Sequence, residues 1–185
     1  MSELASPGQL RASFARWALV LVPGILMLGF LSGAAASSGP TNPWFASLVK
    51  PSLFPPPATF GIVWSILYVL MGLALALVVT ARGASARKAA VTMFAVQLLL
   101  NLAWSPVFFG LHQIKAGLIL LGVIDLAVIV TVLLFYKVRP LAALLLLPYL
   151  AWVLFATVLN WQFLDANPGA DGTSGGDPAA TVEFK

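Results

Sequence analysis

Residues 55–81 read PPPATFGIVWSILYVLMGLALALVVTA, three prolines followed by an uncharged and strongly apolar run. A helix that crosses a bilayer needs about 20 consecutive, mostly apolar residues, and in lipid the backbone groups must be paired within the segment. Proline disfavours helix in the residue before it but fits the first helical position. The stretch therefore predicts a transmembrane helix over 58–81 that begins abruptly, with Pro57 at or just before its start.

Four further apolar runs have the same character, at about 16–37, 89–110, 116–136 and 141–164. The chain is 61% hydrophobic and only 9% charged, whereas soluble domains carry about 25% charged residues. We expect an all-α, integral membrane bundle of five transmembrane helices, with a short head at 1–15. The segment 165–185 is rich in Gly, Pro, Asp and Ala and is predicted to be a disordered tail.

The connectors between these runs are short, which favours antiparallel neighbours, except for the first, 38–57, which is long and proline-rich. One interpretation is that its prolines only start the next helix. The other, favoured by the length and the aromatic residues of the loop, is a stiff lid across the mouth of the bundle. The residues assigned to this lid are Trp44, Phe45, Lys50, Pro51, Pro55, Pro56 and Pro57.

The cations are scattered singly between apolar runs, so the net charge of +4 indicates membrane topology and no nucleic-acid partner. Seven of the ten Lys and Arg lie on the side of the N-terminus and three on the other. Because the side richer in cations faces the cytoplasm, we expect a cytoplasmic N-terminus in a bacterial inner membrane.

The first run, with Arg11 and Arg16 before it and GAAASSG at its end, also resembles a signal peptide. The apolar core of a signal peptide has about 7–15 residues. The first run is longer, so we expect it to be retained in the mature protein.

Amide and aromatic side chains mark one face of the third run. Gln97, Asn101 and Trp104 follow one another at spacings of four and three, which places them on one side of a helix. Amides within a span avoid lipid and face the bundle. They either bond neighbouring helices, the interpretation favoured for Gln97, or orient a ligand in a mostly apolar pocket; for Asn101 both remain open. Pro106 is expected to bend or end this helix.

Two other runs carry a comparable pattern. Trp152, Ala156 and Asn160 stand four residues apart in the fifth run, and Trp64 and Tyr68 form a similar pair in the second. Aromatic rings with a few amides suit a flat aromatic or polycyclic ligand, although packing would also explain them. Other tryptophans, Trp17, Trp44 and Trp161, lie near span ends and fit an interfacial aromatic belt.

Asp125 is the only acidic residue within a span. Because a charged carboxylate in the membrane is costly, we expect it to contact another helix; a part in a proton path is the weaker alternative. Pairs of small residues, Gly29 with Gly33 and Gly72 with Ala76, predict close helix contacts within one subunit or between two.

The sequence offers no catalytic constellation. It has no cysteine and one histidine, His112, on a short connector, where a lone histidine is usually just solvated. No nucleophile–base pair, metal cluster or phosphate loop is recognisable, so we assign no catalytic residue, no metal site and no required cofactor.

Three segments together carry a resemblance: NPWFASLVKPSLFPPPATFGIVWSILY at 42–68, QLLLNLAWSPVFFG at 97–110 and PYLAWVLFATVLN at 148–160. The chain resembles the translocator protein/tryptophan-rich sensory protein family (TspO/MBR, the peripheral-type benzodiazepine receptors) over about 17–162. The resemblance implies a five-helix bundle, usually a homodimer, with a pocket closed by the first long connector. It also implies binding of porphyrins such as protoporphyrin IX or haem, of synthetic isoquinoline and benzodiazepine ligands, and in some members of cholesterol. By motif position, the pocket residues would be Trp64, Asn101, Trp152, Ala156 and Leu159.

The chain departs from the animal members in two places. Their sterol motif ends the fifth helix with a Tyr and a following Arg, where this chain has Trp161 and no cation. A pocket tryptophan early in their fourth helix is replaced by Ala116. The segment LFYKVR at 134–139 does fit a loose sterol pattern.

From these residues we expect a bacterial membrane protein, in the inner or the outer membrane, that is surrounded by membrane lipid and binds a tetrapyrrole. Its expected role is in tetrapyrrole transport, sensing or regulation. Light- and oxygen-dependent porphyrin degradation and a sterol- or lipid-binding scaffold are the alternatives. The expected ligand-binding residues are Trp64, Tyr68, Asn101, Trp104, Trp152, Ala156, Leu159 and Asn160.

Overall fold

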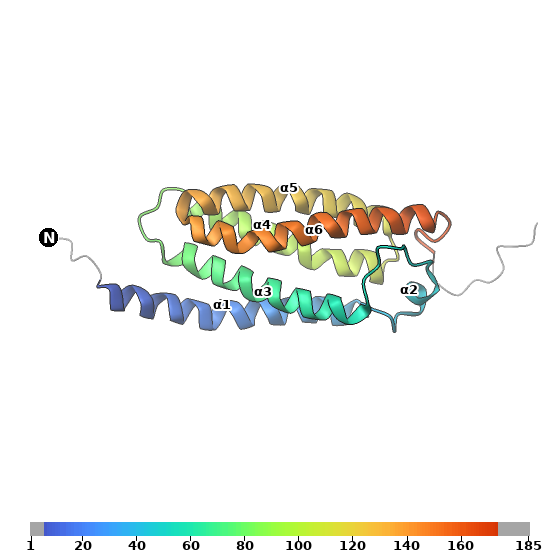
Figure 1. The fold of residues 1–185 in the computed structure, drawn as a ribbon, viewed down its shortest axis with the longest axis horizontal. Helices are drawn as coiled ribbons and strands as arrows, with labels where there is room; N and C mark the ends of the chain where they lie inside the picture. Colours follow the sequence, from blue (N-terminus) through green and yellow to red (C-terminus); the bar gives the residue numbers. More distant parts are fainter. Residues whose placement is uncertain (1–5, 174–185) are drawn as a thin grey trace, which may run out of the picture.

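The computed structural model describes residues 6–173, and this part of the chain is all-α. Five helices are long and apolar enough to cross a membrane, which confirms the predicted fold class. They are α1 (Pro7–Ala35), α3 (Pro57–Thr80), α4 (Arg87–Ser105), α5 (Ile114–Val138) and α6 (Pro140–Ala166). A short helix, α2 (Pro43–Ser47), lies in the first connector at one end of the bundle (Figure 1).

The helices begin earlier than the hydrophobic runs indicate, and local capping explains the largest difference. α1 begins at Pro7, because Ser6 and Gln9 form a reciprocal capping box in which each side chain accepts a hydrogen bond from the other's backbone N–H. α3 begins at Pro57, where the proline pattern placed its start. Pro56 before it has φ −51° and ψ 138°, an extended conformation that keeps the helix from starting sooner.

The bundle consists of antiparallel neighbours in which α5 packs along α6 and α1 along α3, while α4 contacts α5 and α3 contacts α6. Glycine permits the closest of these approaches. A Cβ atom on Gly72 of α3 would lie 2.7 Å from the backbone Cα of Val22 in α1. One on Gly29 would overlap the ring of Tyr68. These two predicted small-residue positions therefore serve contacts within one subunit.

α4 ends as Pro106 predicts, but through a wider turn. The chain continues from Ser105 into a π-helical turn, Pro106–Gly110, and the backbone N–H of Leu111 donates to the carbonyl of Pro106 at 2.9 Å. Such turns are rare in proteins, and those that occur are often found at functional sites. This one buries Phe108 at the α2 end of the bundle.

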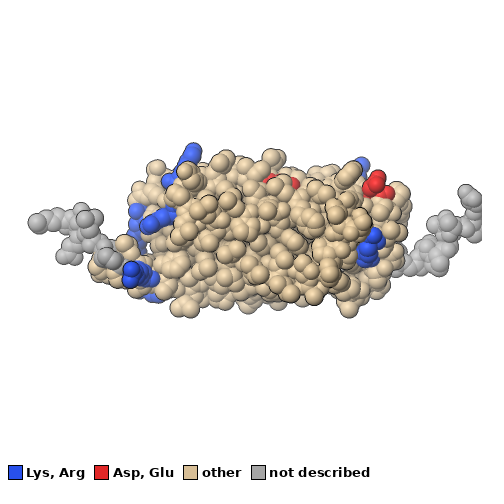
Figure 2. Space-filling model, viewed as in Figure 1, with Lys and Arg blue, Asp and Glu red and all other residues tan. Residues whose placement is uncertain are grey.

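The basic residues divide between the two ends of the molecule. Lys and Arg gather mainly at the end where α1 begins, and fewer lie at the α2 end (Figure 2). The long face between them is almost free of charged side chains in this view. A bundle that spans a bilayer requires an uncharged central surface with charged residues at both ends.

Candidate functional site

The loop between α1 and α3 covers one end of the bundle. Asn42 caps α2, because its side-chain oxygen accepts from the backbone N–H of Phe45 at 3.0 Å, and its amide donates to the carbonyl of Phe109 in the π-helical turn at 3.3 Å. This arrangement turns Trp44 and Phe45 inward, where they are only 2% and 5% exposed. The loop thus has the position and the inward aromatic residues of a lid.

The end of α6 and the turns that follow it hold this loop in place. The Asn167 side chain accepts from the backbone N–H of Val49 at 2.7 Å and donates to the carbonyl of the same residue at 3.0 Å. The indole N–H of Trp44 donates to the carbonyl of Ala170 at 3.3 Å, and the Trp44 ring stacks on His112 with 4.6 Å between centroids. Residues far apart in sequence therefore hold the loop over this end of the bundle together.

Lys50 stabilises the loop through contacts within the loop itself. Its ammonium donates to the carbonyls of Phe45 at 2.6 Å and Leu48 at 2.8 Å, and it lies 4.4 Å from the centroid of the Phe45 ring. Partial burial lowers the pKa of Lys50. The side chain therefore ties the end of α2 to the segment that follows it.

Aromatic rings fill the space directly under the loop. Phe45 packs against Phe163 at 5.6 Å and Phe108 at 6.2 Å between centroids. Phe54 also lies on Phe163, at 5.7 Å. These rings belong to a hydrophobic cluster that includes the predicted pocket residue Leu159. In this structure the mouth of the bundle is closed by side chains.

A buried donor and a buried acceptor without partners lie beneath this cluster. The indole N–H of Trp104 and the side-chain oxygen of Asn160 have no hydrogen-bond partner among the described residues. Both lie close to Gly117, where an added Cβ would be 3.2 Å from the Asn160 oxygen and 3.4 Å from the Trp104 nitrogen. The Asn160 amide nitrogen is satisfied, since it donates to the carbonyl of Ile114 at 2.9 Å. Leaving such groups unpaired costs about 1–3 kcal/mol each, so they are candidate contacts for a polar group of a ligand.

The predicted residues Trp64, Tyr68 and Asn101 lie deeper in the bundle. Trp64 stacks on Tyr68 with 5.1 Å between centroids, and the Tyr68 hydroxyl points to the Asn101 side-chain oxygen over a long 3.4 Å. Gln97 instead accepts a 2.8 Å hydrogen bond from the buried Tyr149 hydroxyl, which agrees with the structural role favoured for it. Asn101 is therefore the less firmly held of the two amides.

Trp152 and Ala156 of α6 border both regions. They are partly buried against the central core, and Trp152 reaches toward the loop through Phe60, 5.8 Å away between centroids. Phe60 in turn lies 5.4 Å from Phe54 of the loop. Phe54, Phe60 and Trp152 thus form a row of aromatic contacts from the loop to α6, and Trp104 packs against both hydrophobic clusters.

The model of the TspO/MBR family matches this chain over residues 19–165, which takes in the loop and all or most of each of the five long helices. The chain belongs to the TspO/MBR family. It is 40% identical to the tryptophan-rich protein TspO of Chlorobaculum tepidum over 151 residues, covering 81% of this chain and 96% of that protein. It is 41% identical to the human translocator protein over 147 residues (78% and 87%), and 37% identical to protein CrtK of Rhodobacter capsulatus over 139 residues (75% and 87%). With its five spans, the chain is an integral multi-pass membrane protein.

Two sequence expectations are corrected in this TspO/MBR protein. Trp44 does not belong to an exposed interfacial belt, because helix α2 turns it into the bundle; Trp17 and Trp161 are 42% and 57% exposed. The segment after Leu164 does not leave the fold at once. α6 continues to Ala166, and residues 167–173 form turns bonded to the loop and to the start of α5. The remaining predicted tail, 174–185, lies outside the described residues.

Three residues that position the loop were not singled out from the sequence: Asn42, Asn167 and, as a stacking partner, His112. The Asn-Pro pair at 42–43 is a recognisable helix start. The contacts of Asn167 and His112 join segments more than 60 residues apart and leave no local signal.

Asp125 accepts a 2.8 Å hydrogen bond from Thr157, and so contacts a neighbouring helix. Residues 6–173 contain no cluster of His, Cys, Asp and Glu that could hold a metal ion.

Proposed function

We propose that this protein binds a flat, hydrophobic tetrapyrrole of the protoporphyrin IX or haem type at the loop-covered end of the bundle. The ligand would lie between the rings of Phe54, Phe60 and Trp152 and those of Trp64 and Tyr68, and the loop 38–57 would open to admit it. Membrane transport, sensing or regulation of tetrapyrroles is the role that such a site would serve.

The observation that carries this proposal is the unpaired polar pair beneath an aromatic cover. The Trp104 N–H and the Asn160 carbonyl oxygen are buried without partners among the described residues, and both pack closely against Gly117. Ligand pockets typically combine apolar walls with a few polar groups that fix orientation. A tetrapyrrole presents both an aromatic face and polar edge groups, and would use both features.

The closed mouth makes loop opening part of the proposal. The rings of Phe45, Phe108 and Phe163 touch one another where the ligand would enter, so a macrocycle must displace some of them. Lid opening is a common gating step in ligand access. The weak Tyr68–Asn101 contact leaves Asn101 able to turn toward a bound ligand.

Tryptophan quenching by protoporphyrin IX in lipid nanodiscs tests the proposal. Trp104→Phe keeps an aromatic ring and removes the N–H, so we expect its Kd to rise about threefold to tenfold, the equivalent of one hydrogen bond. Trp64→Phe changes the stacking surface and should weaken binding as well. Trp161→Phe is the matched control, since that side chain is 57% exposed on the outside of α6 and its loss should leave Kd unchanged.

Equal affinities in Trp104→Phe, Trp64→Phe and the control would remove these residues from the site. The same titrations separate the alternatives. A bilin-like absorbance that develops under illumination and disappears in Trp64→Phe would support porphyrin degradation, and displacement of the porphyrin by cholesterol would support a sterol site. Native mass spectrometry of the protein would test the homodimer that the family resemblance implies.

A further inference from the structure

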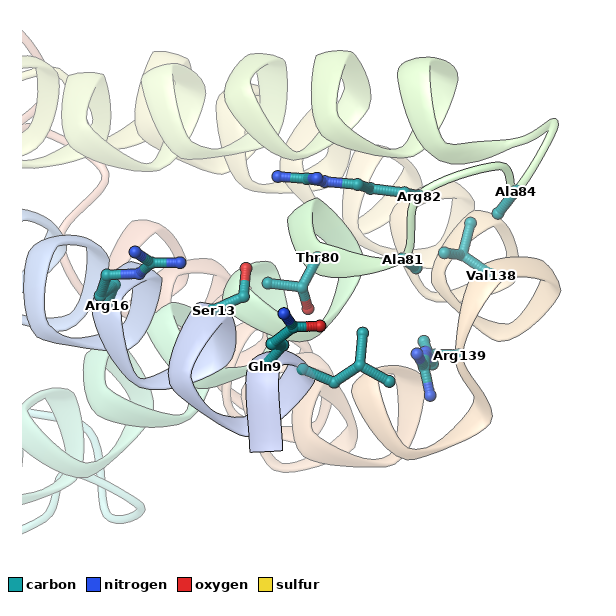
Figure 3. Close-up of a pocket in the computed structure, with 10 residues that line it drawn as sticks. Gln9, Ser13, Arg16, Thr80, Ala81, Arg82, Ala84, Val138 and Arg139 are labelled. Carbon is teal, nitrogen blue, oxygen red and sulfur yellow. The ribbon is translucent and has the colours of Figure 1, made fainter. Parts of the chain in front are cut away.

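A separate cavity lies at the other end of the bundle, where α1 begins. Its volume is about 940 Å³, and it is lined by α1, the end of α3, the connector that follows α3 and the end of α5. Its polar lining consists of Arg16, Arg82, Arg139, Gln9, Ser13 and Thr80. Figure 3 shows Arg16 and Arg82 pointing toward one another, with Gln9, Ser13 and Thr80 between Arg16 and Arg139.

The three arginines of this cavity come from three different segments: Arg16 from α1, Arg82 from the connector after α3, and Arg139 from the residue between α5 and α6. Three like charges around one space repel each other unless an anion lies among them. Within residues 6–173 the acidic side chains are Asp125 in the α5 span and Asp165 and Asp171 at the opposite end. The described part of the chain therefore supplies no counter-charge at this cavity.

The depth of the cavity matches the headgroup region of a bilayer. Thr80 is the last residue of α3, and Arg139 directly precedes the first residue of α6, so the cavity lies at the ends of the membrane spans. The fitting anion is therefore the phosphate of a membrane lipid. Guanidinium groups suit it because their fixed donors match phosphate oxygens in pairs.

A second cavity, of about 510 Å³, is lined by the next residues of α1 and α3 toward the middle of their spans and by the start of α4. It is lined by Trp17 and Leu21, which follow Arg16 on α1, and by Leu75 and Val79, which precede Thr80 on α3. These four apolar side chains offer contact to an acyl chain and none to a free phosphate ion. Arg87 and Lys88 at the start of α4 add positive charge at its rim.

We propose that this end of the bundle holds one anionic phospholipid, with its phosphate in the cavity that Arg16, Arg82 and Arg139 line and an acyl chain along Trp17, Leu21 and Leu75. The site is distinct from the tetrapyrrole site, since the two lie at opposite ends of the bundle. A positive-inside charge bias alone would make any cation at this end equivalent. The lipid site instead makes the cavity arginines special among them, and that difference can be measured.

The experiment is native mass spectrometry of the full-length protein, released from detergent with an equimolar mixture of dioleoyl phosphatidylglycerol and dioleoyl phosphatidylcholine. The test variant is Arg82→Gln/Arg139→Gln. The matched control is Arg11→Gln/Lys137→Gln, which removes the same charge at the same end from residues outside the cavity lining. We expect the wild type and the control to retain phosphatidylglycerol preferentially. The test variant should lose about 25-fold in that preference, at about fivefold per arginine.

Three further measurements distinguish a lipid site from a site for free phosphate and from a loss of folding. Arg82→Lys/Arg139→Lys keeps the charge but not the paired donors of guanidinium, so it should keep only part of the preference. Inorganic phosphate at millimolar concentration should not displace the lipid; if it does, the site takes free phosphate and the lipid proposal is refuted. Equal losses in the test and control variants, or no preference in the wild type, would also refute it. Unchanged thermal unfolding and protoporphyrin IX quenching in the test variant would show that the fold and the tetrapyrrole site are intact.

Discussion

Replacement of Gly72 by alanine is the sharpest test of how the helices meet. The added Cβ would lie 2.7 Å from the Cα and 2.8 Å from the Cγ2 of Val22, and 3.0 Å from its backbone nitrogen. Ordinary contact begins at 3.4 Å, so α1 must retreat by about 0.7 Å. Since two of the three atoms belong to the backbone, no side-chain rotation can relieve the overlap. Overpacking of this kind costs about 1–3 kcal/mol.

Gly61 provides the matched control on the same helix. A Cβ there meets nothing within 4 Å, so Gly61→Ala tests the substitution without the overlap. Alanine is the better helix former at both positions by up to about 1 kcal/mol, and this gain cancels in the comparison. The difference between the two variants should therefore be about 1–3 kcal/mol, with Gly72→Ala the less stable.

Equilibrium unfolding in mixed dodecyl maltoside and sodium dodecyl sulfate micelles, followed by tryptophan fluorescence, measures this difference. If Gly72→Ala were as stable as Gly61→Ala, α1 and α3 would not pack as closely as the structure shows. A variant that is destabilised only in a dimeric preparation would instead place Gly72 at a contact between subunits.

Two further predictions concern hydrogen bonds. Asn167→Ala removes both bonds to Val49, a loss of about 1–3 kcal/mol at 0.5–1.5 kcal/mol per bond, so stopped-flow fluorescence should show faster protoporphyrin IX association and dissociation. Asn167→Asp keeps only the acceptor and should be intermediate; unchanged rates in both would separate loop opening from ligand entry. Thr157→Val leaves the buried Asp125 without its hydroxyl partner and should cost about 1–3 kcal/mol more than Thr131→Val, whose hydroxyl bonds only the carbonyl four residues earlier. Equal unfolding free energies for the two threonine variants would show that the Asp125 contact adds no stability.

The sequence predicts those features of the fold that have a local cause. Pro57 starts α3 and Pro106 ends α4, because the missing N–H and fixed φ of proline act wherever the residue stands. The five spans follow from the length and the apolar character of each run. The early start of α1 also has a local cause, the pair Ser6 and Gln9, although the apolar run itself begins later.

The candidate site is predictable only in part. Spacing along one helix indicates which side chains share a face, as for Trp64 with Tyr68, and the structure stacks these two rings. Spacing cannot show which faces meet across helices. The pairing of Gln97 with Tyr149 and the approach of Trp104 and Asn160 over Gly117 depend on how three helices rotate about their axes.

The contacts of the C-terminal turns would make the proposed opening of the loop a cooperative step. Residues 167–173 bond the loop through Val49 and Trp44. They also bond the connector before α5, since Gly172 donates to the carbonyl of His112 at 2.8 Å and Asp171 accepts from the backbone N–H of Lys115 at 3.0 Å. A loop that lifts away must therefore break these bonds or carry the turns with it.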